Sequence, residues 1–163
     1  MSTQILYVRD HGGDFIPATP QMVLKAAKIH LNRRVRRGVA LTSPELVRNF
    51  LAVTLGDRDI EYFCVICLDT QRRFLRFVEL FRGTLDAASV HPREVVKLAL
   101  ETTQTSAVLL AHNHPSQNRI ASAADEQITR VLRDALGLIG VRLLDHLLVA
   151  GGEVISFAEQ GLL

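Results

Sequence analysis

The sequence predicts an α/β domain in which helices pack in layers against a central sheet. Apolar segments with strand-like patterns alternate with segments of helical spacing, and this alternation is typical of layered α/β folds. The length of 163 residues suits one domain, and 48% hydrophobic residues are enough for a sizeable core. No internal repeat, low-complexity tract or linker divides the sequence.

Residues 1–40 are predicted to form an arm or small extension ahead of the main domain, which is expected at 41–163. Ile5–Val8 has the pattern of a short strand. Thr19 followed by proline predicts a helix start, because proline is favoured at the first helical position. Gly38 can end that helix.

Basic residues gather in this arm. No acidic residue occurs between Asp14 and Glu45, and the basic side chains in this interval are Lys25, Lys28, Arg33, Arg34, Arg36 and Arg37. Such a patch can contact the phosphates of a nucleic acid or another acidic surface. It can equally be the solvated face of a helix, and the net charge of +2 implies no partner by itself.

The first half of the main domain predicts a helix and then a hairpin. Residues 43–45, Ser-Pro-Glu, supply a capping hydroxyl, a proline and an acid near the positive end of the helix dipole. Gly56 can close this helix. The apolar runs Tyr62–Leu68 and Phe74–Leu80 are predicted strands, and the polar segment 69–73 is their turn.

Two cysteines lie in the first of these strands. Cys64 and Cys67 are three residues apart, so their side chains are expected on opposite faces of the sheet. They are poorly placed to form a disulfide or to share a metal ion. We therefore interpret both as small core residues.

The second half of the domain continues the alternation. A loop is predicted at Gly83–Ser89, and His91 with the following proline opens a third helix. Ala107–Ala111 is a short apolar run typical of a fully buried strand, and residues 112–120 form a polar loop. Ser122 can cap a fourth helix.

The C-terminal segment predicts further strands. Two apolar runs occur at Val141–Leu144 and Leu147–Val149, and two glycines then turn the chain into a last run at Val154-Ile155. With these runs, strands and helices alternate to the end of the sequence.

Two histidines follow the buried strand, in the pattern His112-Asn113-His114. Alternate side chains of an extended chain point to the same side, so the imidazoles can lie together and bind a cation such as Zn²⁺. Asp125, near the start of the next helix, can fold back onto them. Three protein ligands and one open position are typical of catalytic zinc. A polar loop without a metal is the plainer alternative, and spacing alone does not decide.

This pattern resembles the JAMM motif of the MPN (JAB) metallopeptidase family, in which a His-x-His-Pro segment is followed by Ser-x-x-Asp. Four segments also resemble successive blocks of the RadC branch: 80–85, 90–95, 111–116 and 145–149. The resemblance covers residues 43–163. Residues 1–40 do not resemble the helix-hairpin-helix region of full-length RadC proteins, so the chain is similar to the short members that carry only the JAB domain.

The resemblance implies a three-layer α/β/α fold, similar to cytidine deaminases and with a mixed central sheet. It also implies a Zn²⁺ cofactor bound by His112, His114 and Asp125. Ser122 matches the serine whose hydroxyl supports the developing oxyanion. By its place just before the first central strand, Glu61 matches the general base, and Glu79, late in the second strand, is the reserve candidate.

One segment departs from the RadC pattern. RadC proteins usually continue His-Pro-Ser with Gly-Asp-Pro-x-Pro, whereas residues 117–121 here read Gln-Asn-Arg-Ile-Ala. The ligand spacing is kept. Replacing the glycine by Gln117 and losing both prolines is expected to alter the loop over the metal and the substrate preference.

Two further histidines have structural interpretations. His91 precedes a proline at a helix start and is expected to be structural. His146 follows Asp145 before an apolar strand, so it is read as a buried, hydrogen-bonded histidine, with a role beside the zinc ligands as the alternative.

The leading hypothesis is a zinc metallopeptidase that hydrolyses peptide or isopeptide bonds of a peptide or protein substrate. The alternative is a nucleic-acid-associated DNA repair accessory protein that binds through residues 25–37. Deamination is disfavoured because the sequence has no H-x-E segment and no proline before its C-x-x-C. The intact ligand set argues against a silent scaffold, and a homodimer is compatible with this fold.

The sequence also bears on location. No apolar run reaches the roughly 18 residues needed to span a bilayer. The N-terminal residues lack the charged start and apolar stretch of a signal peptide. The protein is therefore expected to be cytoplasmic, with no membrane partner.

Overall fold

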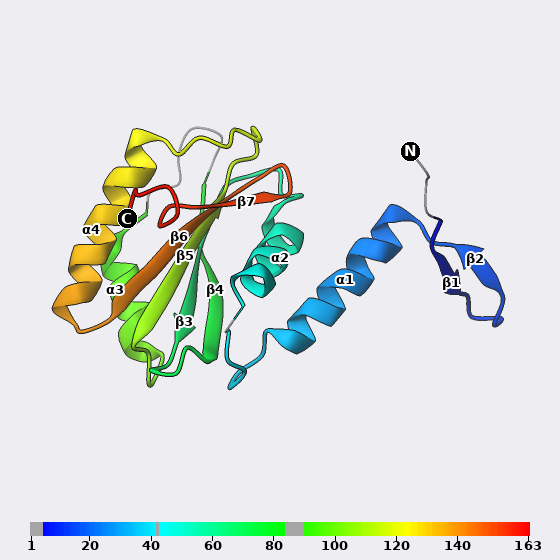
Figure 1. Ribbon diagram of the computed structural model, residues 1–163, viewed down its shortest axis with the longest axis horizontal. Helices are drawn as coiled ribbons and strands as arrows, with labels where there is room; N and C mark the ends of the chain where they lie inside the picture. Colours follow the sequence, from blue (N-terminus) through cyan, green and yellow to red (C-terminus); the bar gives the residue numbers. More distant parts are fainter. Residues whose placement is uncertain (1–4, 42, 84–89) are drawn as a thin grey trace.

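The computed structural model describes residues 5–41, 43–83 and 90–163, and Figure 1 shows their arrangement. The predicted loop at 83–89 therefore lies almost wholly outside the described residues. The helices and strands are β1 (Tyr7–Arg9), β2 (Phe15–Pro17), α1 (Pro20–Arg34), α2 (Pro44–Leu55), β3 (Tyr62–Leu68), β4 (Phe74–Arg82), α3 (Pro92–Glu101), β5 (Ala107–Asn113), α4 (Ala123–Leu138), β6 (Arg142–Ala150) and β7 (Glu153–Ser156).

A five-stranded mixed sheet is the centre of the fold. Its strand order is β4-β3-β5-β6-β7. The pair β5–β6 is parallel, and the other three pairs are antiparallel. Parallel neighbours need a crossover connection, and α4 supplies it. The predicted α/β class with a mixed central sheet is confirmed.

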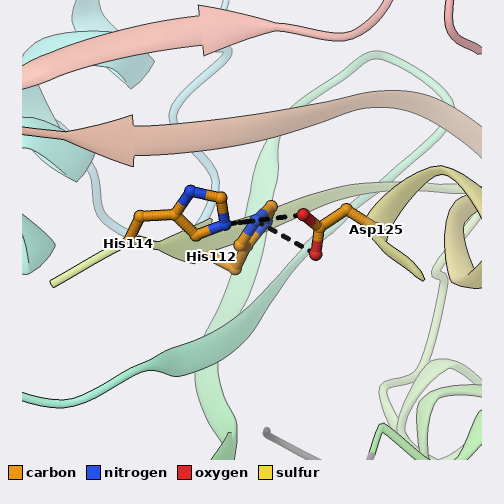
Figure 2. Close-up of side chains that lie close together, drawn as sticks. All are labelled: His112, His114 and Asp125. Atoms are coloured by element: carbon orange, nitrogen blue, oxygen red, sulfur yellow. Dashed lines mark hydrogen bonds and ion pairs between the residues drawn. The ribbon is translucent and has the colours of Figure 1, made fainter. Parts of the chain in front are cut away.

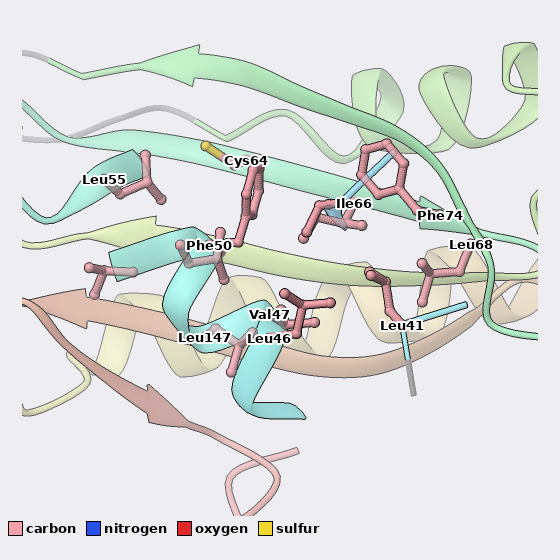
Figure 3. Close-up of a cluster of buried hydrophobic side chains, with 14 of the residues drawn as sticks. Leu41, Leu46, Val47, Phe50, Leu55, Cys64, Ile66, Leu68, Phe74 and Leu147 are labelled. Carbon is pink, nitrogen blue, oxygen red and sulfur yellow. The ribbon is translucent and has the colours of Figure 1, made fainter. Parts of the chain in front are cut away.

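Helices cover both faces of this sheet. In Figure 1, α3 and α4 lie on one side of the strands and α2 lies on the other. On the α2 side, Phe50 and Leu51 pack with Ile66 and Leu147, and Figure 3 shows this cluster between α2 and the strands. On the other side, Leu132 of α4 packs with the alternate residues of β3 and β5. The two hydrophobic clusters share the sheet as their common wall.

The cysteines confirm the predicted alternation of β3. Cys64 belongs to the cluster under α2, and Cys67 belongs to the cluster under α3 and α4. Both are free and buried. Burial raises the pKa of each thiol, so both remain protonated core residues.

The N-terminal arm extends away from the sheet in Figure 1. The predicted strand at Ile5–Val8 is shifted, because β1 begins at Tyr7 and pairs with β2, which the sequence did not predict. Thr19 caps α1 as expected, accepting a hydrogen bond from the Met22 backbone N–H. No residue of α1 is buried, although Leu31 packs partly against the cluster under α2.

Two predicted strand ends were wrong, and two predicted runs form a single strand. β4 continues to Arg82, and β5 continues through Asn113, so His112 lies inside a strand rather than in a polar loop. The two C-terminal apolar runs are one strand, β6, because the intervening Asp145 and His146 have their polar atoms hydrogen-bonded within the fold. Among the described helices, none combines the length and apolar character needed to cross a membrane.

Candidate metal centre

The C-terminal end of β5 presents the two histidines. His112 is 1% exposed and pairs with Phe63 of β3. His114 follows the strand directly, and its backbone N–H donates to the Val149 carbonyl at 2.9 Å. As the alternation predicted, the two imidazoles lie together, and their Nε2 atoms are 3.2 Å apart.

The start of α4 presents the carboxylate. Ser122 caps this helix through a reciprocal capping box with Asp125. The Ser122 backbone N–H and hydroxyl donate to Asp125 Oδ2 at 2.8 and 2.6 Å, and the Asp125 N–H donates to the Ser122 hydroxyl oxygen at 3.1 Å. The cap therefore fixes the carboxylate beside the histidines, with Oδ1 nearest His112 and the capped Oδ2 nearest His114.

Figure 2 shows the Asp125 carboxylate pointing toward the two imidazoles. Oδ1 lies 3.4 Å from His112 Nε2, and Oδ2 lies 3.4 Å from His114 Nε2. These three residues form a group whose candidate ligand atoms all lie within 4.8 Å of one another. A tetrahedral Zn²⁺ with bonds of about 2.0–2.1 Å separates its ligand atoms by about 3.3–3.4 Å. The spacing of the three side chains therefore fits such an ion.

Electrostatics couple the three residues. Burial opposes ionisation of Asp125, but hydrogen bonds from His112 and His114 outweigh it and hold the pKa of this carboxyl well below its usual range. The Asp125 hydrogen bond raises the pKa of His114 above its ordinary value, although burial opposes the shift. The Asp125 carboxylate favours a positive charge beside it, and in the metal-free centre a proton on His114 supplies that charge.

The sequence of this chain matches a known domain family. A model of the RadC-like JAB domain matches residues 41–162. The chain belongs to the RadC-like JAB domain family. It is 52% identical to a UPF0758 protein of Thioalkalivibrio sulfidiphilus over 143 residues, which are 88% of this chain and 63% of the relative. It is 51% identical to one of Aeromonas hydrophila and 52% identical to one of Vibrio cholerae, each over 86% of this chain and 62% of the relative.

The match covers most of this chain but only part of each relative. The chain spans about three-fifths of the length of these curated relatives. Within this span, the chain is a RadC-like JAB domain whose His-His-Asp group could hold a metal.

The two candidate bases of the JAB domain have different surroundings. Glu61 directly precedes β3, and the alternation of that strand, continued by one residue, would place its side chain on the face of Phe63 and His112. Its charge contributes to the raised pKa of His114. Glu79 pairs with Cys64, on the α2 side, and its carboxylate accepts from Arg58 at 2.8 Å. This placement favours Glu61 over Glu79.

Asn113 is a residue of the site that sequence reasoning missed. It lies between the two histidines, so its side chain points to the other face, where it is 2% exposed. Its amide oxygen accepts from the Tyr62 N–H at 2.8 Å, and its amide nitrogen donates to the Ile60 carbonyl at 3.0 Å. Both bonds hold the backbone on either side of Glu61. The signal in the sequence was an amide residue directly after a buried apolar run, because a buried amide needs hydrogen-bond partners.

The altered loop also orients a histidine. Gln117 replaces the usual glycine of the family pattern and adopts a left-handed φ of 60°, which glycine takes without strain. Its N–H donates to the His114 carbonyl at 2.9 Å. In return, His114 Nδ1 lies 2.9 Å from the Asn118 carbonyl oxygen. The turn therefore leaves His114 Nε2 directed at the other candidate ligands.

A polar cavity of about 210 Å³ adjoins His114. Asp57, Arg58 and Asp59 line it together with Gln117. A second cavity, of about 360 Å³, also contains Asp57 and Gln117 in its wall and reaches Leu24 and Lys28 of α1. The altered loop therefore borders both cavities, and α1 of the arm borders the second.

We predict that Asn113→Ala lowers the free energy of unfolding by about 2 kcal/mol, because it removes two buried hydrogen bonds and leaves backbone groups unpaired. Urea denaturation measures this. Asn32→Ala, at an exposed position of α1, is the control and should change stability by under about 0.5 kcal/mol. Equal stability of the Asn113 variant and the parent would contradict the bridging role.

A second prediction concerns pH. His114 must lose its proton to bind zinc, and its pKa is raised, so zinc affinity should fall as pH drops through neutrality. The metal-free protein should behave oppositely. Protonated His114 stabilises it fully below the ordinary pKa of 6.5, and this stabilisation is lost as pH rises through the raised value.

Zinc titrations against a competing chelator and thermal melts of chelator-treated protein, each at about pH 6 and pH 8, measure the two trends. An equal zinc affinity at both values would contradict the first. Melting temperatures of the metal-free protein that rise with pH would contradict the second.

Proposed function

We propose that this chain is a zinc-dependent hydrolase of peptide or isopeptide bonds, a metallopeptidase of JAMM type. The observation that carries the proposal is the convergence of His112, His114 and Asp125, whose candidate ligand atoms lie within 4.8 Å of one another and could share one ion. Zinc sites with three protein ligands leave a position for water, which is what hydrolysis requires. Membership of the JAB family supports the same reading.

Each residue of the candidate centre would have a separate role in hydrolysis. When bound, Zn²⁺ polarises a carbonyl and lowers the pKa of water to about 7. Glu61 takes the proton of the attacking water and passes it to the leaving amine, since a carboxylate on the histidine face is suited to both transfers. His114 and His112 supply neutral nitrogens, and Asp125 supplies the only negative charge of the ligand set.

Ser122 supports the oxyanion of the tetrahedral intermediate. Its hydroxyl donates to Asp125 Oδ2 in the capping box, so it must rotate toward the substrate to act. Rotation does not strand Oδ2, because that oxygen keeps the hydrogen bond from the Ser122 backbone N–H. A donor that is released only when charge develops favours the transition state over the ground state.

We assign residues 41–163 to the catalytic domain, with a three-layer arrangement similar to cytidine deaminases, and residues 1–40 to an arm. A peptide or protein substrate is part of this proposal, and the polar wall of the cavity beside His114 is compatible with backbone amides.

The proposal predicts separate effects of two substitutions. His114→Ala removes a ligand and should abolish zinc binding. Glu61→Gln should retain zinc and lose hydrolysis by about 10²–10⁴-fold, because only the general base is removed. Zinc content by elemental analysis and cleavage of a quenched fluorescent peptide library and of lysine isopeptides are the measurements.

Glu79→Gln is the matched control and should remain active. Absence of zinc from parent protein prepared without chelator would overturn the metal assignment. Full activity of Glu61→Gln would move the role of base to another residue.

A second candidate function is nucleic-acid binding by the arm, in a DNA repair accessory role. The observation that favours it is exposure: Lys25, Lys28, Arg33, Arg34, Arg36 and Arg37 are all exposed. None of them forms an ion pair with another residue in the described part of the chain. Four of the six lie on α1, where one rigid element presents them together.

Binding by the arm predicts a steep salt dependence. The slope of log affinity against log salt should be about −0.9 for each phosphate contacted on duplex DNA. Replacing Lys25, Lys28 and Arg33 by glutamate should weaken binding and flatten this slope. Replacing the exposed Arg130 and Arg133 of α4 is the control and should change neither. Fluorescence anisotropy with a labelled duplex measures both, and binding that is absent or insensitive to salt would exclude this function.

A further inference from the structure

A buried chain of hydrogen bonds leads away from the candidate metal centre. His112 Nδ1 lies 2.9 Å from His146 Nε2, and His146 Nδ1 lies 2.6 Å from the Thr129 hydroxyl oxygen. That hydroxyl donates to the Asp125 backbone carbonyl. His112 and Thr129 are 1% exposed and His146 is 0% exposed, so water has no access to complete these bonds in another way.

The positions of the protons follow from the one nitrogen that faces the ligand group. His112 directs Nε2 at His114 and Asp125. If this nitrogen binds a cation, the His112 proton must sit on Nδ1, which then donates to His146 Nε2. His146 therefore carries its own proton on Nδ1 and donates to Thr129. Every donor in the chain then meets an acceptor.

We infer that His146 and Thr129 are positioning residues of the metal centre. They hold His112 in the tautomer and orientation that present Nε2 to the ion. This inference rests on the proposed zinc site and deepens it by naming the parts of β6 and α4 that support a ligand of β5.

The chain of bonds also ties two of the ligands to each other. Thr129 lies one turn beyond Asp125 on α4, and its hydroxyl reaches the Asp125 carbonyl. The carboxylate of the same Asp125 faces His112. An ion between them would close a ring through His112, His146, Thr129 and Asp125. A change in any member therefore moves both ligands relative to each other.

His146 gives this ring a neutral outer partner. The aromatic rings of Phe63 and Phe157 lie 5.5 and 4.5 Å from its own ring. Burial and the neighbouring His112 lower the pKa of His146, in agreement with a neutral acceptor. Metal-bound histidines commonly donate to carboxylates, backbone carbonyls or water. A neutral imidazole adds no negative charge, so Asp125 alone offsets the charge of the ion.

Affinity for Zn²⁺ tests the inference without reference to activity. His146→Leu removes the acceptor and should weaken zinc binding by about 10–100-fold. His146→Gln can place an amide oxygen near the position of Nε2 and should restore most of this loss. Competition with a fluorescent chelator measures the affinities, and melting of the metal-free variants measures their folding.

Thr129 supplies a matched pair that preserves the size of the side chain. Thr129→Val removes the hydroxyl and should weaken zinc binding, whereas Thr129→Ser keeps it and should bind as the parent does. A purely structural role predicts that zinc affinity stays unchanged while the metal-free protein melts lower. That outcome in both the His146 and Thr129 pairs would overturn the inference.

The parent protein supplies an independent measurement. In its zinc-loaded form, ¹⁵N-resolved NMR of the imidazoles should place protons on Nδ1 of both His112 and His146. A proton on His146 Nε2 would overturn the inference even where the variants fail to fold. A parent that binds no zinc would defeat the proposed function as well, whereas a parent that binds zinc as tightly as His146→Leu would defeat this inference alone.

Discussion

The reciprocal cap between Ser122 and Asp125 is the interaction on which the candidate centre depends. Asp125 Oδ2 accepts from the helix N-terminus and also lies beside His114, and Oδ1 lies beside His112. The cap fixes the start of α4, and the contacts with the histidines make the same carboxylate part of the candidate metal site. The helix dipole adds to this effect, because the positive N-terminus favours the ionised carboxylate.

The parallel pair β5–β6 explains how the cap reaches the histidines. The crossover helix α4 must begin near the end of β5 in order to return the chain to the start of β6. The carboxyl end of β5 and the N-terminus of α4 are therefore neighbours for topological reasons. Alternation within β5 then sends His112 and His114 to the helix α4 side and Asn113 to the other side, where it holds the backbone that carries Glu61.

Much of the fold and of the candidate centre could be predicted from local sequence patterns. Period-two alternation placed the histidines together and the cysteines apart, and cap residues located the starts of α1, α2 and α4. The ends of strands were harder to predict. In the sequence, polar residues such as His112 and Asp145 look like the end of an apolar strand, whereas in the fold their side chains are hydrogen-bonded and the strand continues. Their hydrogen-bond partners come from distant segments, so no local pattern reveals them.

The choice between two glutamates shows the same limit. Phe63 pairs with Phe81, whereas the next residue, Cys64, pairs with Glu79. The bulge at Leu80 places both Leu80 and Phe81 on the α4 side and turns Glu79 toward α2. Counting along β4 without the bulge would put Glu79 on the wrong face. A β-bulge is a property of the pair of strands, so the assignment required the register.

The side chains of the loop after His114 do not hold the candidate ligands in place. The ligand positions depend on a strand, a capped helix and buried partners, none of which uses the side chains of residues 117–121. The backbone of this loop keeps only two bonds to His114, and Gln117 retains them in a left-handed conformation. Its side chain lies against Gly151 and borders both cavities. Sequence change there can therefore reshape these cavities while the ligand geometry stays the same.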